Sequence, residues 1–421
     1  MPHTADTTFA DSPADLSNWR TTPHSRWAFH HVDELMPTAP IAADPTAVRA
    51  LQAADAGRLE GFRLAVAADR SLSLEQVLQA TATDAFLVLH DGRVVQESYA
   101  KVGELTALTG LAGPRIVENT AEVGSPGTRH ILMSATKSVV GLIAGILRSH
   151  GSLDLESAVS RIVPEVAHTA YRDATVRQLL DMRTGIRFEP AEQAAYARAS
   201  GWEPVPAGEP GADLHGFFER SPAGSAPHGG PFSYVSANTD LLGWIIERVT
   251  GKPFAELASE LLWKPMGAER DAFITTDSHG APRCTGGLCS TLRDFARVGQ
   301  LVIEHGAHGS VQVVPPAWLD DIAAGGDLDA WRQGEFFTAF GSRPMSYRSG
   351  WYVVHAEPTL MFAMGIHGQQ LFVDRANRLV VAKFSSQSLP TDPRAIGLTS
   401  LAFAEIRRCL LDGRIAAHSH A

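Results

Sequence analysis

The strand-like parts of this chain lie near its two ends, and this arrangement restricts the fold more than any other feature. Residues 84–100, "DAFLVLHDGRVVQESYA", form two β-rich runs separated by Asp91-Gly92, a strong signal for a hairpin turn. Comparable runs return only much later, as "SGWYVVHA", "LMFAMGIHG" and "QLFVDRANRLVVAKFSS". Because a lone hairpin is marginally stable in water, we expect the early hairpin to join the late strands in one antiparallel sheet.

The chain between these regions, from 151 to about 290, has a helical and loop-rich pattern. In "TDLLGWIIERVTGKPF", Gly251 is predicted to end one helix and Phe254 to begin another. Further helices are expected at 295–304 and in "AIGLTSLAFAEIRRCLLDG". The pattern predicts an α+β fold, with an antiparallel sheet flanked by helices and an inserted, mainly helical subdomain.

This pattern divides the chain into three predicted parts. Residues 81–150 and 291–421 are expected to form the α/β body, and residues 151–290 the helical insertion. Residues 1–80 are expected to be an N-terminal arm packed on the body by the Trp and Phe side chains of "NWRTTPHSRWAFHHVDELMP".

The composition points to small-molecule chemistry. A formal charge of -10 argues against nucleic acid or an anionic membrane surface as the main partner. No apolar run reaches the roughly 18 residues of a membrane span, the N-terminus does not resemble a secretory signal, and three cysteines fit a reducing compartment. We therefore expect a cytoplasmic enzyme without metal or cofactor, since Cys284, Cys289, His305 and His308 lack a metal-ligand pattern. Its oligomeric state stays open between a monomer and a homodimer.

The segment "HILMSATKSVVGLIAGILRSHG", residues 130–151, carries the candidate chemistry. The chain uses arginine for positive charge and contains five lysines, yet Lys137 lies within this apolar run. Desolvation and the positive end of a helix dipole both lower the pKa of such an amine, which can then take a proton from Ser134 three residues before it. The pair supplies the nucleophile and base of a serine hydrolase, and the Ser134 N–H at the helix start can hold an oxyanion.

Ser-x-x-Lys occurs twice in this chain, so the tetrapeptide alone proves little. The other match, Ser98 to Lys101, falls at the end of the predicted hairpin, where an offset of three residues points side chains to opposite faces. For Ser134 the alternative interpretation is an ordinary helix N-cap. That alternative does not explain Lys137 inside the apolar run.

Four motifs in order, "SATK", "FSYVSANTDLLGWIIERVTGKPF", "CTGGLCSTLRDFARVGQLV" and "MGIHGQQLFVD", resemble the serine β-lactamase and penicillin-binding-protein superfamily. The resemblance is to its class C β-lactamase-like esterase branch, and within it to the 6-aminohexanoate-dimer hydrolases, which cut short nylon oligomers and carboxyl esters. It implies that Tyr234 is catalytic. A phenol beside Lys137 can relay a proton, and an ammonium there would favour its phenolate; the alternative is a core tyrosine with a bonded hydroxyl.

The second motif departs from the superfamily pattern. Tyr-x-Asn is usual, whereas this chain has Tyr234-Val235-Ser236 with Asn238 two residues further on. The resemblance makes Ser236 and Asn238 candidate substrate contacts. An acidic-acidic-Tyr run of the nylon-oligomer hydrolases is missing near 187–202, and Tyr196 is a candidate substitute.

The third motif departs as well. Aligned as Ala363-Met364-Gly365, it keeps only the glycine and lacks the Lys or His that would hold a β-lactam carboxylate. In this register the Ile366 N–H is the second oxyanion donor, with Gly365 and His367 as substrate-binding candidates. The alternative register, His367-Gly368-Gln369, moves the donor to Gln370; we prefer the first.

These residues predict a cofactor-free serine hydrolase that forms an acyl-enzyme on Ser134 with small carboxyl esters, and with linear amides such as 6-aminohexanoate oligomers. A β-lactamase or D-amino-acid peptidase is the enzymatic alternative. A catalytically silent binding protein on the same scaffold is the alternative from another class.

Overall fold

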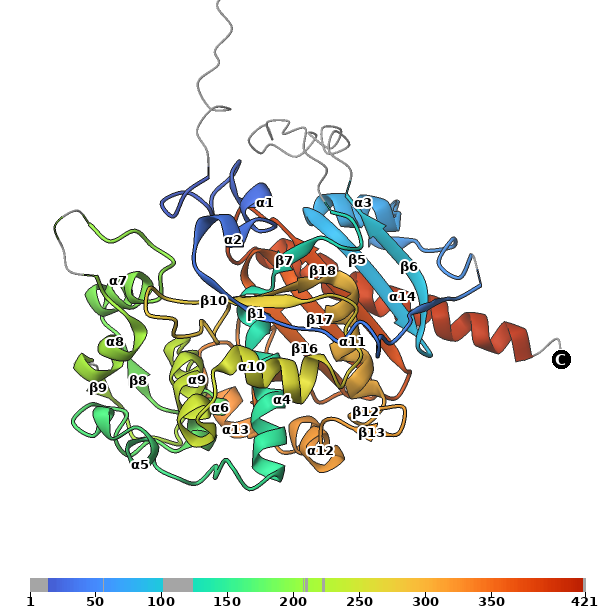
Figure 1. The fold of residues 1–421 in the computed structure, drawn as a ribbon. Helices are drawn as coiled ribbons and strands as arrows, with labels where there is room; N and C mark the ends of the chain where they lie inside the picture. Colours follow the sequence, from blue (N-terminus) through green and yellow to red (C-terminus); the bar gives the residue numbers. More distant parts are fainter. Residues whose placement is uncertain are drawn as a thin grey trace, which may run out of the picture.

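A computed structural model describes residues 14–418, apart from 56, 101–123, 207, 209–210 and 222–223. Its main element is an eight-stranded sheet in the order β14-β15-β16-β17-β18-β5-β6-β2 (Figure 1). The strands are β2 (Gln52–Ala53), β5 (Thr83–His90), β6 (Arg93–Tyr99), β14 (Met345–Arg348), β15 (Trp351–Val354), β16 (Leu360–Gly365), β17 (Gln369–Asp374) and β18 (Leu379–Ser385). All neighbours are antiparallel except β2 and β6, so the predicted α+β class is confirmed.

The early hairpin joins the late strands as the sequence predicted. Strand β5 pairs with β6 on one side and with β18, almost 300 residues later in the chain, on the other. Asp91 and Gly92 both have positive φ, 51° and 76°, which suits the two-residue turn that connects β5 to β6.

Helices cover both faces of the sheet (Figure 1). The side chains of β18 point alternately to the two faces. Val380 and Ala382 belong to the core shared with α4 (Thr136–Ser149) and α11 (Leu292–Ile303). Leu379 and Val381 belong to the core on the side of α3 (Leu74–Ala80) and α14 (Pro393–His418). Within the described part of the chain, no helix has both the length and the apolar character needed to cross a membrane.

Helix α4 lies unusually close to its neighbours. A Cβ on Gly141 would lie 1.8 Å from the Ser349 carbonyl oxygen, and one on Gly145 would lie 2.2 Å from the Trp318 ring. From the other side, a Cβ on Gly350 would lie 2.3 Å from the Lys137 carbonyl oxygen. Small residues therefore hold this helix in one position against the sheet.

A second, four-stranded sheet has the order β1-β10-β11-β7. Its strands are β1 (Thr38–Ile41), β7 (Arg129–Ile131), β10 (Ala272–Thr275) and β11 (Leu288–Thr291). Both β10 and β11 come from the end of the stretch assigned to the helical insertion, and strands of only four residues were not recognised there from the sequence pattern. This sheet brings the N-terminal arm and the end of the insertion beside the segment that leads to Ser134.

The stretch 151–270 is otherwise mainly helical, and its elements from α5 to α9 gather at one end of the molecule (Figure 1). Helix α9 ends at Thr250, with Gly251 in the left-handed conformation, as predicted. The helices are α5 (Val159–Ile162), α6 (Val176–Leu180), α7 (Pro190–Ala199), α8 (Leu214–Arg220), α9 (Ala237–Thr250) and α10 (Phe254–Ala258), with a π-helical turn at Ser259–Trp263. Two short strands, β8 (Ile186–Arg187) and β9 (Gly224–Ser225), also lie in this stretch. The remaining elements elsewhere are α1 (Ser25–Ala28), α2 (Val32–Leu35), β3 (Leu64–Ala67), β4 (Arg70–Leu72), β12 (Ala307–His308), β13 (Val311–Gln312), α12 (Pro316–Ala324) and α13 (Leu328–Arg332).

The N-terminal arm packs on the body through aromatic and ionic contacts. Trp19 is buried, with its ring edge-on to Trp202 at a centroid distance of 5.2 Å. Arg26 pairs with the buried carboxylate of Asp84 on β5, its Nε lying 2.7 Å from Oδ1. The arm thus contacts both the insertion and the main sheet.

Candidate active site

Ser134 lies in a 3-10 turn, Met133–Ala135, between β7 and helix α4. The turn is tight, since Met133 has a φ of +48°. Ala135 is the N-cap residue of α4 and makes no side-chain cap bond, so Ser134 is not the ordinary helix cap of the alternative interpretation. Its Oγ instead accepts a hydrogen bond from Lys137 Nζ at 3.1 Å.

Lys137 is buried on the first turn of α4, with 1% of its surface exposed. Its Nζ also donates to the Thr285 carbonyl oxygen at 2.7 Å. Burial lowers the pKa of the amine well below its usual value, against the opposing effect of the Asp240 carboxylate. A neutral amine beside a serine hydroxyl can act as a general base.

Tyr234 completes the group from the segment before α9. Its ring centroid lies 4.9 Å from Lys137 Nζ, and its hydroxyl is hydrogen-bonded to the Ser134 side chain. Burial raises the pKa of Tyr234, which the Ser134 bond offsets only in part. The phenol therefore stays protonated. The expectation that a neighbouring ammonium would favour the phenolate did not take account of the burial of the phenol, which is the largest influence on its pKa.

The segment 333–344, between α13 and β14, lies against Tyr234. The Glu335 carboxylate accepts a hydrogen bond from the Tyr234 backbone N–H, and the Phe336 ring stacks on the Tyr234 ring with centroids 5.4 Å apart. Sequence analysis missed both residues. They lie about 100 residues from Tyr234 in a stretch that has no motif.

The end of β16 lies against the turn that holds Ser134. A Cβ on Gly365 would lie 2.4 Å from the Leu132 carbonyl oxygen and 3.0 Å from the Ser134 backbone nitrogen. Ile366 follows directly and is half-buried. This proximity favours the register in which the Ile366 N–H is the second oxyanion donor, since Gln370 pairs inside the sheet with residues of β16 and β18.

Three candidate substrate contacts lie inside the protein. His367 has 1% of its surface exposed, and its Nδ1 is 2.7 Å from the Gln387 carbonyl oxygen. Asn238 is fully buried, and its Nδ2 donates to Thr184 Oγ1 at 3.1 Å. Tyr196 is also buried, with its hydroxyl bonded to Asp240 and Arg283. These internal hydrogen bonds do not agree with direct contact to a substrate, whereas Ser236 is half-buried beside Tyr234 in the chain.

Sequence analysis also missed a group of hydrogen-bonded residues next to the Lys137 amine. Asp240, Arg283 and Thr285 are buried, and each bonds to another member of the site. The rejected tetrapeptide lies elsewhere: Ser98 is on β6, and Lys101 is outside the described residues.

Comparison with known proteins gives the family of the chain. A family model described as β-lactamase matches residues 72–405. The 6-aminohexanoate-dimer hydrolase of Paenarthrobacter ureafaciens is 35% identical over 403 residues, which is 94% of either chain. A shorter match, 29% identical over 37% of this chain and 42% of the relative, is to esterase EstB of Burkholderia gladioli.

Solved structures give the same result. A Bacillus anthracis structure provisionally named 6-aminohexanoate-dimer hydrolase superposes with a TM-score of 0.81 and 26% identity, covering 95% of this chain and 99% of that one. A family VIII carboxylesterase shares the fold, with a TM-score of 0.54, 19% identity and coverage of 77% and 92%. The resemblance inferred from the motifs is confirmed. The chain belongs to the β-lactamase family and has the fold of its hydrolases.

Proposed function

We propose that the protein is a serine hydrolase that cleaves small carboxyl esters, and linear amides such as 6-aminohexanoate oligomers, through an acyl-enzyme on Ser134. The observation that carries the proposal is the buried Lys137 amine, which bonds to the Ser134 hydroxyl at 3.1 Å beside the Tyr234 phenol. The named activity of the Paenarthrobacter relative supports the choice of substrates.

The first half of the reaction forms the acyl-enzyme. Ser134 Oγ attacks the substrate carbonyl carbon while Lys137 takes the hydroxyl proton. The Ser134 and Ile366 N–H groups hold the oxyanion of the tetrahedral intermediate. Tyr234 is protonated and hydrogen-bonded to Ser134, so it is suited to pass a proton to the leaving alcohol or amine.

The second half releases the acid. Water attacks the acyl carbonyl and gives one proton to the Lys137 amine, and the bond from Ser134 Oγ to the acyl carbon breaks as Oγ takes that proton from the ammonium. An amine leaving group departs only when protonated, so amide cleavage places a heavier demand on Tyr234 than cleavage of an activated ester.

The runner-up activity, hydrolysis of β-lactams or D-amino-acid peptides, has less support. Ala363 stands where the superfamily usually has a cation, and its side chain is fully buried in β16. The substrate carboxylate therefore lacks the partner that this position usually offers.

The test is turnover of three substrates by the purified protein: a p-nitrophenyl acyl ester, a linear 6-aminohexanoate dimer and a chromogenic cephalosporin. Ser134→Ala is expected to abolish turnover, whereas Ser98→Ala, which changes the rejected tetrapeptide, is expected to retain it. No turnover by the unaltered protein, or equal turnover by Ser134→Ala, contradicts the proposal. Cephalosporin turnover above that of the ester favours the runner-up.

The proposal includes a small-molecule substrate and a cytoplasmic location, with the oligomeric state open between monomer and homodimer. Mass measurement of the native protein in solution distinguishes the two states.

A further inference from the structure

A hydrogen-bonded chain connects Lys137 to a buried carboxylate on helix α9. Lys137 Nζ donates to the Thr285 carbonyl oxygen at 2.7 Å, and the Thr285 N–H donates to Asp240 Oδ1 at 2.7 Å. Asp240 has 3% of its surface exposed. One residue, Thr285, thus bonds the amine with its carbonyl and the carboxylate with its N–H.

The second oxygen of that carboxylate is held by a buried cation. Asp240 Oδ2 accepts hydrogen bonds from Arg283 Nη1 and from the Tyr196 hydroxyl. The guanidinium lies over two rings, 4.5 Å from the centroid of Tyr196 and 4.8 Å from that of Trp202. Arg283 has 5% of its surface exposed, so the two opposite charges compensate each other away from solvent.

These two charges act on Lys137 in opposite directions. The Asp240 carboxylate favours the ammonium form of the amine and the Arg283 guanidinium disfavours it. Because both groups are buried, water screens neither effect strongly. Removing either one leaves a single uncompensated charge near the amine.

We infer that the Asp240–Arg283 pair is a positioning and charge-setting unit of the active site: it fixes the Thr285 carbonyl against the Lys137 amine, and Arg283 offsets the charge of Asp240 beside that amine. The inference rests on the proposed function and extends it to the control of its base. Tyr196 is then a positioning residue, which holds the carboxylate and stacks on the guanidinium.

Other titratable groups face the site without forming this link. Tyr234 lies over the amine, and Glu335 and Tyr347 lie beyond Tyr234. On the strand side, the ion pairs of Asp181 with Arg177 and Arg348 lie behind the Ser349–Gly350 turn that packs on α4. None of these carboxylates or guanidinium groups bonds Thr285 in the described part of the chain.

The experiment is the pH profile of kcat/KM for a p-nitrophenyl ester, with the purified full-length protein. Turnover needs the neutral amine, so kcat/KM rises with pH as Lys137 loses its proton. This rising part of the profile is called the limb. Arg283→Met leaves Asp240 uncompensated and is expected to move this limb to higher pH by one unit or more, with at least a tenfold loss at neutral pH. Asp240→Asn leaves the Arg283 charge uncompensated and is expected to move the limb to lower pH. The plateau of kcat/KM at high pH is expected to fall, because Thr285 loses its bond to the carboxylate.

Three control variants accompany these two. Arg283→Lys keeps the cation and is expected to keep the original limb. The double variant Asp240→Asn with Arg283→Met removes both charges and is expected to return the limb toward its original pH. Arg297→Met breaks a comparable buried pair with Asp294 in α11 and is expected to leave the limb unmoved.

A second measurement follows the amine itself. The chain has only five lysines, so the 13Cε signal of Lys137 in 13C-lysine-labelled protein is assigned by its loss in Lys137→Arg. Its titration midpoint is expected to shift in the same opposite directions, and Asp240→Asn alone tests the inference if Arg283→Met does not fold. Shifts in one common direction, or none, overturn the inference. Turnover that persists in Ser134→Ala overturns the proposed function instead.

Discussion

Two lysine–serine pairs with buried amines lie in the described part of the chain, and of these two only one has the surroundings of a reaction site. Lys137 bonds to Ser134 at the start of α4, and Lys383 bonds to Ser385 on β18. Both amines are almost completely buried, and burial lowers the pKa of both, in Lys383 to about 7. A serine beside a deprotonable amine is therefore not enough to identify a nucleophile.

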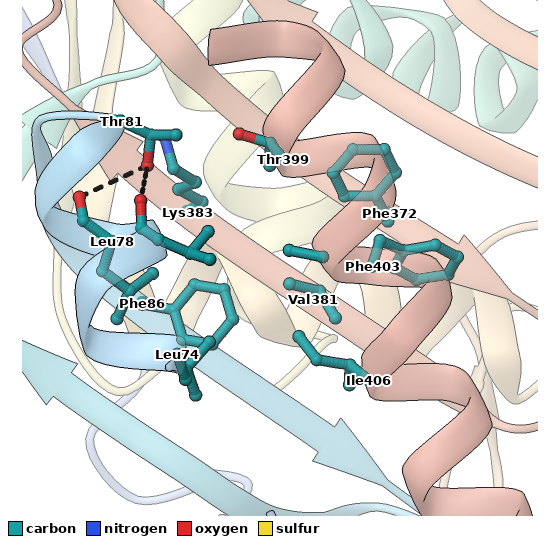
Figure 2. Close-up of a pocket in the computed structure, with 12 residues that line it drawn as sticks. Leu74, Leu78, Thr81, Phe86, Phe372, Val381, Lys383, Thr399, Phe403 and Ile406 are labelled. Carbon is teal, nitrogen blue, oxygen red and sulfur yellow. Dashed lines mark hydrogen bonds between the residues drawn. The ribbon is translucent and has the colours of Figure 1, made fainter. Parts of the chain in front are cut away.

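The two pairs differ in what lies around the hydroxyl. Ser134 is half-buried beside the Tyr234 phenol and the end of β16, whereas Ser385 is fully buried within the sheet. Lys383 lines a cavity of about 10 Å³ between the sheet, α3 and α14, walled mainly by apolar side chains (Figure 2). That volume is at the lower limit for one water molecule, so a substrate does not fit beside Lys383.

The largest expected effect tests this contrast directly. Lys137→Arg keeps a long cationic side chain but removes the base, because guanidinium does not lose its proton, and it is expected to lower kcat/KM for the p-nitrophenyl ester by about 10³-fold or more. Lys383→Met, the matched change at the other pair, is expected to stay within about threefold at pH 8. Retained activity in Lys137→Arg contradicts the assignment of the base.

Tyr234→Phe is expected to have the next largest effect, and to depend on the leaving group. Loss of the proton relay is expected to cost about 10²-fold for the 6-aminohexanoate dimer or an alkyl ester. The loss is expected to be smaller for the p-nitrophenyl ester, whose leaving group departs without a proton. Steady-state kinetics with both substrates measure the difference, and equal losses argue against a relay.

Gly365→Ala is expected to lower kcat by roughly 10- to 100-fold, because its Cβ would push the end of β16 away from the Ser134 N–H. Gly397→Ala is the matched control, since a Cβ there meets nothing within 4 Å. Circular dichroism checks that both variants fold. An unchanged kcat in Gly365→Ala counts against Ile366 as the second oxyanion donor.

Lys383→Met is expected to change the pH dependence of stability. The folded protein releases the Lys383 proton near pH 7, whereas the unfolded chain holds it up to about its ordinary pKa of 10.5. Since the unfolded state binds more protons in this window, Lys383 makes the free energy of unfolding rise with pH from 7 toward 10. The stabilisation by methionine is therefore expected to be greatest at pH 7 and to shrink by pH 9, as measured by urea unfolding. A constant difference contradicts this assignment.

The sequence correctly predicted features that depend on local patterns. The hairpin turn at Asp91-Gly92, the end of α9 at Gly251 and the bond from Lys137 to Ser134 each depend on residues close together in the chain. The sequence did not reveal the parts assembled from distant segments. Glu335 meets Tyr234 across 101 residues, and Arg283 meets Asp240 across 43, with no motif to connect them.

The errors have the same origin. A tyrosine beside a lysine suggested a phenolate, but burial of the ring, which depends on packing by residues such as Phe336 and Tyr347, reversed the direction. His367 and Asn238 were chosen by their position in motifs and Tyr196 as a substitute for a missing motif, whereas their hydrogen-bonding partners lie in other segments of the fold.

The segment 333–344 has a consequence for how this enzyme is able to acquire new substrates. It contacts Tyr234 through the Glu335 carboxylate and the Phe336 ring. Helix α4, in contrast, is held by Gly141 and Gly145, and a larger residue at either position would displace backbone or the Trp318 ring. Variation in this segment is therefore expected to change the surroundings of Tyr234 without moving the nucleophile or its base. A library built to redirect the enzyme toward other esters or oligomers belongs in this segment, and α4 is best left unchanged.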